Sequence, residues 1–354
     1  MTDGVASEPA RSPAPSTRAT IRDVAEAAGV SRSTASRALT GRGYVAPAVK
    51  ERVRKAARTL GYVPDAMARH LRQQESNSIG VLVTDLRNDF YANLASGVSQ
   101  QARRRGYTMM LADDNGAQEV ETEAAEALVA LRVAGVILTP VSADVSEYLA
   151  RHRIPVVEVD RQFASGSCDA VVVDNEAAAR RVTTGLLELG HRRIALVIDE
   201  MDWTTGRNRY AGYAAAFALA GVPLDPDLVV TAGWDVAAAR QGARTLLTAA
   251  QPPTAVFAAN NVLAEGVWRA AADLGLQIPD QLSLVSFDDA PWMSMVSPGI
   301  TAVAQDAAAL GAAAVTQLLE RIETPDAPVR TVLLSAELRH RGSTAQPRPS
   351  ATGH

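Results

Sequence analysis

The chain is poor in the residues that build covalent or metal cross-links. It has 354 residues but one cysteine, Cys168, which excludes an internal disulfide framework and suggests a buried structural thiol. Its five histidines lack the spacing of metal ligands, so we predict no metal site and no cofactor. There is no apolar run of about eighteen residues and no apolar signal-peptide core, so we expect a cytoplasmic protein without a membrane span.

Sequence motifs of catalysis are also missing. The chain contains no Walker phosphate-binding loop, no Gly-x-Ser-x-Gly nucleophile elbow and no Gly-rich dinucleotide fingerprint. Adjacent carboxylates such as Asp113-Asp114 and Asp288-Asp289 would point to different sides of a strand, so they do not form a paired acid and base. We therefore expect a protein that is not an enzyme.

The charged residues are distributed unevenly along the chain. The net charge of the whole chain is −4. Between Arg18 and Arg72, however, twelve Lys and Arg stand against four Asp and Glu, which gives a local charge of +8 and leaves −12 for the remainder. Such an asymmetry predicts contact with a polyanion at one end of the molecule.

Residues 20–37 have the pattern of a helix-turn-helix. Thr20 can cap a first helix, Gly29 can end it with a positive φ, and Ser31 can cap a second helix directly afterwards. A third helix is predicted over residues 47–60, because proline suits a first helical turn. On this stretch alone, an ordinary helical hairpin is the alternative.

The second predicted helix carries side chains that suit DNA. Arg32, Ser33 and Arg37 would lie on its exposed face, within reach of base edges and phosphates. Together with the local positive charge, this favours a DNA-binding domain over residues 18–64 and a nucleoid-associated protein. The Pro- and Ser-rich residues 1–17 have no hydrophobic periodicity and are expected to be disordered.

From residue 79 onwards, short apolar runs alternate with segments of helix length. Residues 79–83, 171–173 and 194–198 read as buried strands between helices. This alternation predicts a two-lobed α/β core, each lobe a parallel sheet with helices on both faces. Ligands of such folds bind at the carboxyl ends of the strands, in the crevice between the lobes.

Motifs across nearly the whole chain resemble the LacI/GalR family of bacterial transcriptional regulators. The family's D-V-A-x-x-A-G-V-S-x-x-T-V-S-R-x-L corresponds to residues 23–39, with Ala35 in place of Val. Its G-Y-x-P-N-x-x-A-R-x-L corresponds to residues 61–71, with Asp65 in place of Asn. Further signatures match at residues 189–195, 209–213, 259–261 and 286–289.

The resemblance implies a repressor that binds a near-palindromic operator as a homodimer. In the family, the second helix enters the major groove, and a hinge helix and linker, here residues 65–77, inserts a leucine, here Leu71, into the minor groove. The DNA contacts implied in this way are Thr20, Arg32, Ser33, Thr34, Ser36, Arg37, Ala68 and Leu71.

The resemblance also implies a periplasmic-binding-protein-like core over residues 78–340, which binds an effector and forms the dimer. By analogy, the first lobe comprises residues 78–160 and 291–324, and the second comprises residues 161–290 and 327–340. Residues 341–354 lack the heptad leucines of a tetramerising coiled coil and are expected to be a disordered tail, so we predict a dimer.

The effector contacts that the resemblance implies are Phe90, Tyr91, Arg161, Arg209, Trp234, Asn260 and Asp288, with Asp85 and Asn88 as weaker candidates. Asp288 and Asn260 can hydrogen-bond hydroxyls, and Trp234 offers a flat face to a sugar ring or a base. We expect a sugar or sugar derivative, with a nucleobase or nucleoside as the alternative. A solute-binding protein is less favoured, since it would need an export signal and would have no reason for a helix-turn-helix. Asn261 replaces the family's usual Asp.

Overall fold

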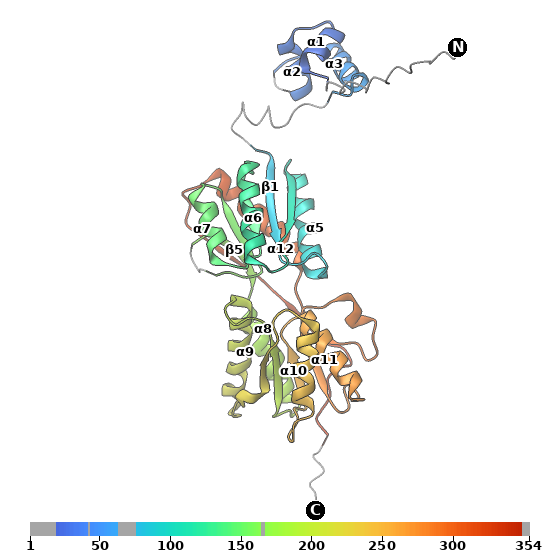
Figure 1. Ribbon diagram of the computed structural model, residues 1–354, viewed down its shortest axis with the longest axis vertical. Coiled ribbons are helices and arrows are strands. Elements are labelled where there is room, and N and C mark those ends of the chain that lie inside the picture. The colour runs from blue at the N-terminus through green and yellow to red at the C-terminus, as the bar shows by residue number, and fades with distance from the viewer. Residues whose placement is uncertain (1–18, 42, 63–75, 164–166, 349–354) are drawn as a thin grey trace, which may run out of the picture. The chain divides into compact units, whose positions relative to one another are not determined.

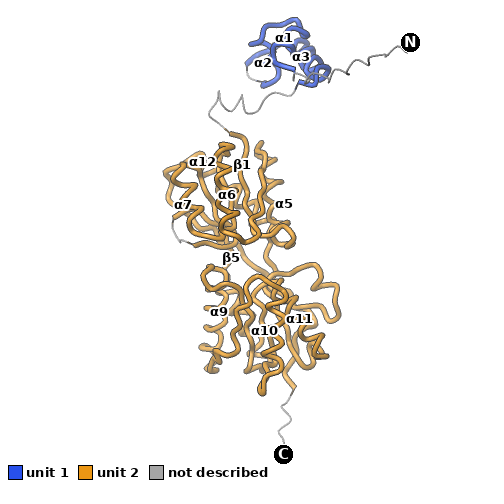
Figure 2. Tube along the Cα trace, viewed as in Figure 1, with its two compact units in different colours: residues 1–75 blue, residues 76–354 orange. Residues whose placement is uncertain are grey.

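The computed structural model describes residues 19–41, 43–62, 76–163 and 167–348. The chain divides into two compact units, residues 1–75 and 76–354, and each has its own hydrophobic core (Figure 2). The disordered segment expected at 1–17 and the hinge contacts expected at Ala68 and Leu71 lie outside the described residues. In the part of the chain that is described, no helix is both long and apolar enough to cross a membrane.

The described residues of the first unit form three short helices, α1 (Ile21–Ala27), α2 (Arg32–Thr40) and α3 (Pro47–Thr59). The Thr20 hydroxyl accepts the N–H of Asp23, and the Asp23 carboxylate accepts the N–H of Thr20, so α1 begins with a capping box. The Ser31 hydroxyl accepts the N–H of Thr34 and caps α2. The predicted order of helix, turn and helix is confirmed.

Small apolar side chains fill the core of the first unit. Val24, Ala25, Ala35, Ala38 and Val53 are buried between the three helices. On α2, the two alanines occupy the inner side, which leaves the polar residues of this helix on the outer side.

In the second unit, the described residues 76–163 and 167–348 form two six-stranded sheets. The first sheet has the order β11-β5-β4-β3-β1-β2, and all its neighbours are parallel. Its strands are β1 (Ser78–Val83), β2 (Thr108–Asp113), β3 (Val136–Leu138), β4 (Val156–Val159), β5 (Asp169–Val173) and β11 (Thr331–Leu334). One face is covered by α5 (Asp89–Arg104) and α12 (Ala307–Glu323), the other by α6 (Gln118–Ala130) and α7 (Ala143–Arg151) (Figure 1).

The second sheet has the order β12-β10-β9-β8-β6-β7, and only β12 runs antiparallel to its neighbour among the described strands. Its strands are β6 (Ile194–Ile198), β7 (Val229–Thr231), β8 (Ala255–Ala258), β9 (Ser283–Phe287), β10 (Thr301–Ala304) and β12 (Glu337–Arg339). Two helix pairs pack against it, α8 (Asn175–Glu188) with α9 (Thr204–Ala220) and α10 (Val236–Leu247) with α11 (Asn261–Asp273). Short 3-10 helices lie before β7, at η1 (Pro226–Leu228), and after β9, at η2 (Pro291–Ser294). The predicted fold class is confirmed.

The chain passes between the lobes three times, but the predicted lobe boundaries are wrong. β5 pairs with β4 and β11, so residues 169–173 belong to the first lobe and not to the second. β10 pairs with β9, so residues 301–304 belong to the second lobe, and β11 belongs to the first. A short apolar strand can join either sheet, and its hydrogen-bond partners decide which. The crossings fall between β5 and α8, β10 and α12, and β11 and β12.

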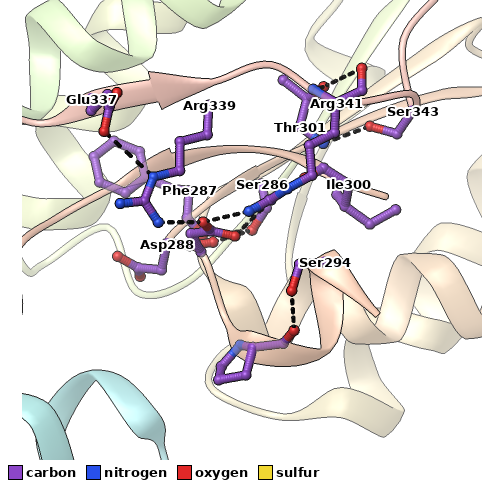
Figure 3. A network of polar contacts seen from close by, with 12 residues as sticks. Ser286, Phe287, Asp288, Ser294, Ile300, Thr301, Glu337, Arg339, Arg341 and Ser343 are labelled. Atoms are coloured by element: carbon purple, nitrogen blue, oxygen red, sulfur yellow. Dashed lines mark hydrogen bonds and ion pairs between the residues drawn. The ribbon is translucent and has the colours of Figure 1, made fainter. Parts of the chain in front are cut away.

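The expected disordered tail at 341–354 is wrong for residues 341–348, which pack against the second sheet. Ser343 is fully buried, and its hydroxyl accepts the N–H of Thr301 at 2.8 Å (Figure 3). Nε2 of the buried His191 lies 2.9 Å from the carbonyl oxygen of Ala345. These polar partners, which are distant in sequence, hold a segment that has no hydrophobic pattern of its own. Residues 349–354 lie outside the described residues.

Glycines let α5 and α12 approach closely. A Cβ atom placed on Gly97 would collide with the backbone of Ala308, and one on Gly311 would collide with the carbonyl oxygen of Leu94. Only glycine fits at these two contacts. This close packing fixes the position of α5, whose first residues reach the cleft between the lobes.

Candidate functional site

The outer side of α2 is the candidate DNA-binding face. Arg32, Ser33, Ser36 and Arg37 are exposed there, and Thr34 is half-buried. Nε of Arg37 donates to the carbonyl oxygen of Ser33 at 3.4 Å, whereas Arg32 makes no hydrogen bond or ion pair with any described residue. An exposed arginine without a structural partner is available for a ligand, which fits the predicted role of this face.

Thr20, another predicted DNA contact, lies at the start of α1. Its hydroxyl is already engaged, since it accepts the N–H of Asp23 and lies 2.9 Å from the Asp23 carboxylate. Hydrogen bonds from the Thr20 backbone and hydroxyl hold the pKa of the Asp23 carboxyl below its usual value. The Thr20 hydroxyl therefore caps α1, and its predicted DNA contact would have to form with this cap in place.

In the second unit, the buried guanidinium of Arg161 ties together the ends of three strands of the first lobe. Its Nε donates to the carbonyl oxygen of Pro140 at 2.7 Å, and a terminal nitrogen donates to the Thr84 hydroxyl at 2.6 Å. The other terminal nitrogen lies 3.4 Å from the Tyr91 hydroxyl. From the second lobe, the ring of Trp203 covers the guanidinium at 4.0 Å.

Arg209 of α9 occupies a similar place in the second lobe. Its Nε donates to Oδ1 of Asn175 at 2.8 Å, and a terminal nitrogen donates to the carbonyl oxygen of Ala259 at 2.6 Å. Its guanidinium carbon lies 3.7 Å from the centre of the Phe287 ring. Neither this arginine nor Arg161 forms an ion pair with a described carboxylate, so both are held mainly by neutral partners.

Three buried aspartates follow strands that end at the cleft. Asp160 follows β4, Asp199 follows β6 and Asp288 follows β9. Burial raises the pKa of all three carboxyl groups, that of Asp160 to about 6, and the nearby arginines oppose the increase. Asp160 and Asp288 also have left-handed backbone conformations, with φ of 73° and 65°. Such strain in residues other than glycine is concentrated at functional sites.

The centre of the cleft is nearly filled by these side chains. A cavity of about 10 Å³ is lined by the three aspartates, both arginines and Trp234, among others. Oδ1 of Asp199 and Nε1 of Trp234 are buried and have no hydrogen-bond partner among the described residues. Leaving such groups unpaired is costly, so they mark positions where a ligand can complete the hydrogen bonding. A second cavity of about 560 Å³ adjoins this one, and Phe90 and Asp288 line both.

Six of the seven predicted effector positions line the central cavity, and Asn260 is the exception. The Asn260 side chain is buried, and it caps α11 by accepting the N–H of Leu263. Its amide nitrogen donates to Oδ2 of Asp199 at 3.2 Å. Asn260 thus contacts Asp199 and does not line the central cavity, and its predicted ligand contact stays a prediction. The weaker candidate Asp85 forms an ion pair with Arg87 and lines neither cavity.

Amide side chains join the two lobes beside the cleft. Asn88 caps α5 in the first lobe by accepting the N–H of Phe90, and Asn261 begins α11 in the second lobe. The two amides exchange hydrogen bonds of 3.2 and 3.0 Å, and both residues are buried. The N–H of Gln162 adds a bond of 2.8 Å to the Thr204 hydroxyl. The lobes are therefore held together by specific polar contacts.

Comparisons with known proteins agree with this architecture. Residues 20–65 match the model for bacterial regulatory proteins of the lacI family, and residues 183–344 match that for the periplasmic binding protein-like domain. The chain is 32% identical to the ribose operon repressor of Escherichia coli (strain K12) over 328 residues, which covers 92% of this chain and 99% of that protein. The chain belongs to the LacI family.

Solved structures of LacI-family proteins share the fold. The Lac repressor dimer bound to operator and the anti-inducer ONPF aligns with 93% of this chain and 100% of that chain, at 25% identity and a TM-score of 0.83. A LacI family regulator from Enterococcus faecium with bound ribose covers 76% of this chain and 99% of its own, at 28% identity and a TM-score of 0.66. This LacI-family protein is a DNA-binding transcriptional repressor, and its relatives are repressors and not enzymes.

The LacI-family motifs did not identify every residue at the cleft. Asp160, Asp199 and Thr205 also line the central cavity, and Thr84 holds Arg161 in place. Asp160 and Asp199 each follow an apolar strand directly, as Asp288 does, and an acidic residue in this position is a signal that the sequence itself contains. Applied to every strand, this signal would have found both. Thr205 lies inside α9 and has no comparable signal.

Proposed function

We propose that this LacI-family repressor binds a small ligand between its two lobes and that the ligand controls its affinity for operator DNA. The proposal depends on the buried polar centre of the cleft, where Oδ1 of Asp199 and Nε1 of Trp234 lack partners. A hydroxyl group can both donate to a carboxylate and accept from an indole. A sugar or sugar derivative has this chemistry, and the ribose operon repressor and the ribose-bound regulator among the similar proteins support this class.

A nucleobase or nucleoside is a second candidate ligand, because aromatic rings meet at the cleft. The ring of Trp234 lies 6.1 Å from that of Tyr91 and 6.4 Å from that of Trp203, measured between centroids. These rings pack against each other, and an aromatic face that turns towards a ligand can stack on a flat base as well as on a sugar ring. Nucleosides therefore belong in the same binding screen as sugars.

On the DNA side, we infer that two copies of α2 enter successive major grooves of a near-palindromic operator. Arg32 and Ser33 would contact bases, and Arg37 a base or the backbone. A single helix-turn-helix offers few base contacts, so a homodimer and two half-sites are needed for selectivity. The Lac repressor dimer bound to operator supports this arrangement.

The size of the central cavity implies a rearrangement when a ligand enters. Ligand sites usually measure about 300–1,000 Å³, whereas the central cavity has a volume of about 10 Å³. The lobes, or the side chains between them, must therefore move before a sugar can occupy the centre. A ligand that prefers one lobe arrangement shifts the population towards it, and this is how occupation of the cleft would alter DNA affinity.

Thermal-shift screening against monosaccharides, disaccharides and nucleosides tests the proposal, followed by titration of an operator selected from random DNA. A ligand that binds the native state raises its melting temperature. Asp288→Ala should abolish the effect of the ligand on operator binding and leave the affinity of the ligand-free protein for operator nearly unchanged. An undiminished effect in this variant would contradict the assignment of the cleft.

A further inference from the structure

Carboxylates outnumber guanidiniums around both cavities of the cleft. The central cavity is lined by three carboxylates, those of Asp160, Asp199 and Asp288, and by two guanidiniums. The larger cavity is lined by five carboxylates and one guanidinium, that of Arg339. A ligand that fills either cavity therefore meets more carboxyl groups than guanidiniums.

One of the carboxylates at the larger cavity is neutralised within the protein. Asp289 accepts hydrogen bonds from Arg339 at 2.9 Å and from Arg341 at 2.7 Å. Burial alone would raise the pKa of the Asp289 carboxyl, but these arginines hold it below its usual value. The same contacts engage Arg339, the one guanidinium that lines the larger cavity. That guanidinium is therefore already compensated and is poorly placed to attract an anion.

The two guanidiniums at the centre are also committed. All three nitrogens of Arg161 donate to or contact neutral oxygens of the first lobe, and two of the three nitrogens of Arg209 do the same in the second lobe. Binding a phosphate or carboxylate in a bidentate manner requires two N–H groups on one free edge of the guanidinium. Arg161 uses three of its five N–H groups in this way and Arg209 uses two of its five, so neither guanidinium offers all its donors to an anion.

One of the two unpaired atoms at the centre, Oδ1 of Asp199, selects further against anions. Oδ1 of Asp199, in a side chain that is 1% exposed, needs a hydrogen-bond donor. Hydroxyl groups supply donors, whereas phosphate and carboxylate oxygens are acceptors. An anionic oxygen beside this carboxylate would add like-charge repulsion, which is weakly screened in a buried site. Charge and hydrogen-bonding capacity therefore favour the same class of ligand.

We propose, on the basis of the proposed ligand-controlled function, that the cleft accepts uncharged, hydroxyl-rich ligands and excludes their anionic derivatives. Free sugars and nucleosides would bind, whereas sugar phosphates, sugar acids and nucleotides would not act as effectors. The regulator would then respond to a compound before it is phosphorylated or oxidised, and the reaction that adds the charge would remove the signal.

Matched pairs of compounds test this proposal on the full chain by isothermal titration calorimetry at fixed pH and salt. The pairs are D-ribose with D-ribose 5-phosphate, D-glucose with D-glucose 6-phosphate, and adenosine with adenosine 5′-monophosphate. At least one neutral member should bind, and its phosphate should bind on the order of a hundredfold more weakly, as expected for one weakly screened like charge.

Asp199→Asn tests whether charge is the cause. The asparagine keeps an oxygen that can accept from Asn260, so the geometry is preserved while one negative charge is removed. The preference for the neutral member over its phosphate should fall about tenfold or more. Asp227→Asn is the matched control, because Asp227 is exposed in η1 and lines neither cavity. It should leave the preference unchanged.

The outcomes separate this inference from the proposed function. A phosphate that binds as tightly as its neutral partner, or an unchanged preference in Asp199→Asn, would overturn the exclusion of anions and leave a ligand-controlled repressor in place. Binding of no compound of either charge would overturn the ligand-controlled function itself, and the exclusion with it. Melting temperatures of the variants near that of the native chain show that folding is intact.

Discussion

Breaking the amide pair between Asn88 and Asn261 should remove a measurable part of the free energy of unfolding that couples the two lobes. The pair consists of two hydrogen bonds, of 3.2 and 3.0 Å, between buried side chains of different lobes. A buried hydrogen bond contributes about 0.5–1.5 kcal/mol net to stability. Two such bonds should therefore contribute about 1–3 kcal/mol to the free energy of unfolding.

The choice of substitutions follows from the second role of Asn88. Its oxygen also caps α5, so Asn88→Ala would add the loss of a helix cap, which costs about 0.5–2 kcal/mol. Asn88→Ser keeps a capping oxygen on a side chain too short to reach Asn261. Combined with Asn261→Ala, it completes a double-mutant cycle. Each single change leaves one amide unpaired, so the double variant should be less destabilised than the sum by about 1–3 kcal/mol.

Urea unfolding followed by tryptophan fluorescence measures this coupling energy. The four tryptophans, at positions 203, 234, 268 and 292, all lie in the second lobe, so the signal excludes the helix-turn-helix unit. The matched control is Asn93→Ser with Asn261→Ala, because Asn93 lies on α5 but is exposed. The control pair should be additive within about 0.5 kcal/mol. If the Asn88 pair were equally additive, the amide contact would not couple the lobes.

Three further predictions concern other parts of the chain. In gel-shift titrations, Arg32→Ala should weaken the free energy of binding to the selected operator by about 1–3 kcal/mol and that of binding to random DNA by much less. Equal losses on both would exclude base recognition by this residue. Gly311→Ala should lower the melting temperature because its Cβ would collide with the carbonyl oxygen of Leu94, whereas Gly185→Ala in α8, where nothing lies within 4 Å, should stabilise by about 0.5–1 kcal/mol. Burial lowers the pKa of His191 in the native state below its ordinary value, so the unfolded chain binds the proton more tightly. Stability should therefore fall as the pH drops below about 6.5. His191→Gln should reduce that fall in melting scans at several pH values.

The helix-turn-helix could be predicted closely because its signals are local. Thr20 and Ser31 cap the helices that they precede, and Gly29 has a φ of 62° after α1. Each of these choices depends on backbone groups within three or four residues, which a sequence pattern records. The alternation of strands and helices in the core is equally local, and the fold class followed from it.

Lobe membership could not be predicted, because it depends on contacts distant in sequence. The apolar run of β5 looks the same whether its neighbour is β4 or β6, and only the pairing with β4 and β11 decides. The cleft shows the same limit. The Asn260 side chain caps α11 and bonds to Asp199 at the end of another strand, a contact between residues distant in sequence that the motif alone does not reveal. Thr205, inside α9, lines the central cavity without any local signal.

The interleaving of the two sheets has a consequence for synthesis on the ribosome. The register of the first sheet pairs Ala170 with Thr331, and that of the second pairs Val303 with Leu338. The edge strands of the two sheets, β11 and β12, are therefore synthesised after all the other strands. Pairings of such long sequence separation form slowly, and unpaired strand edges invite association with other chains. A product that stops before residue 331 would expose an edge of both lobes at once, so incomplete synthesis should yield aggregates and not a half-active repressor.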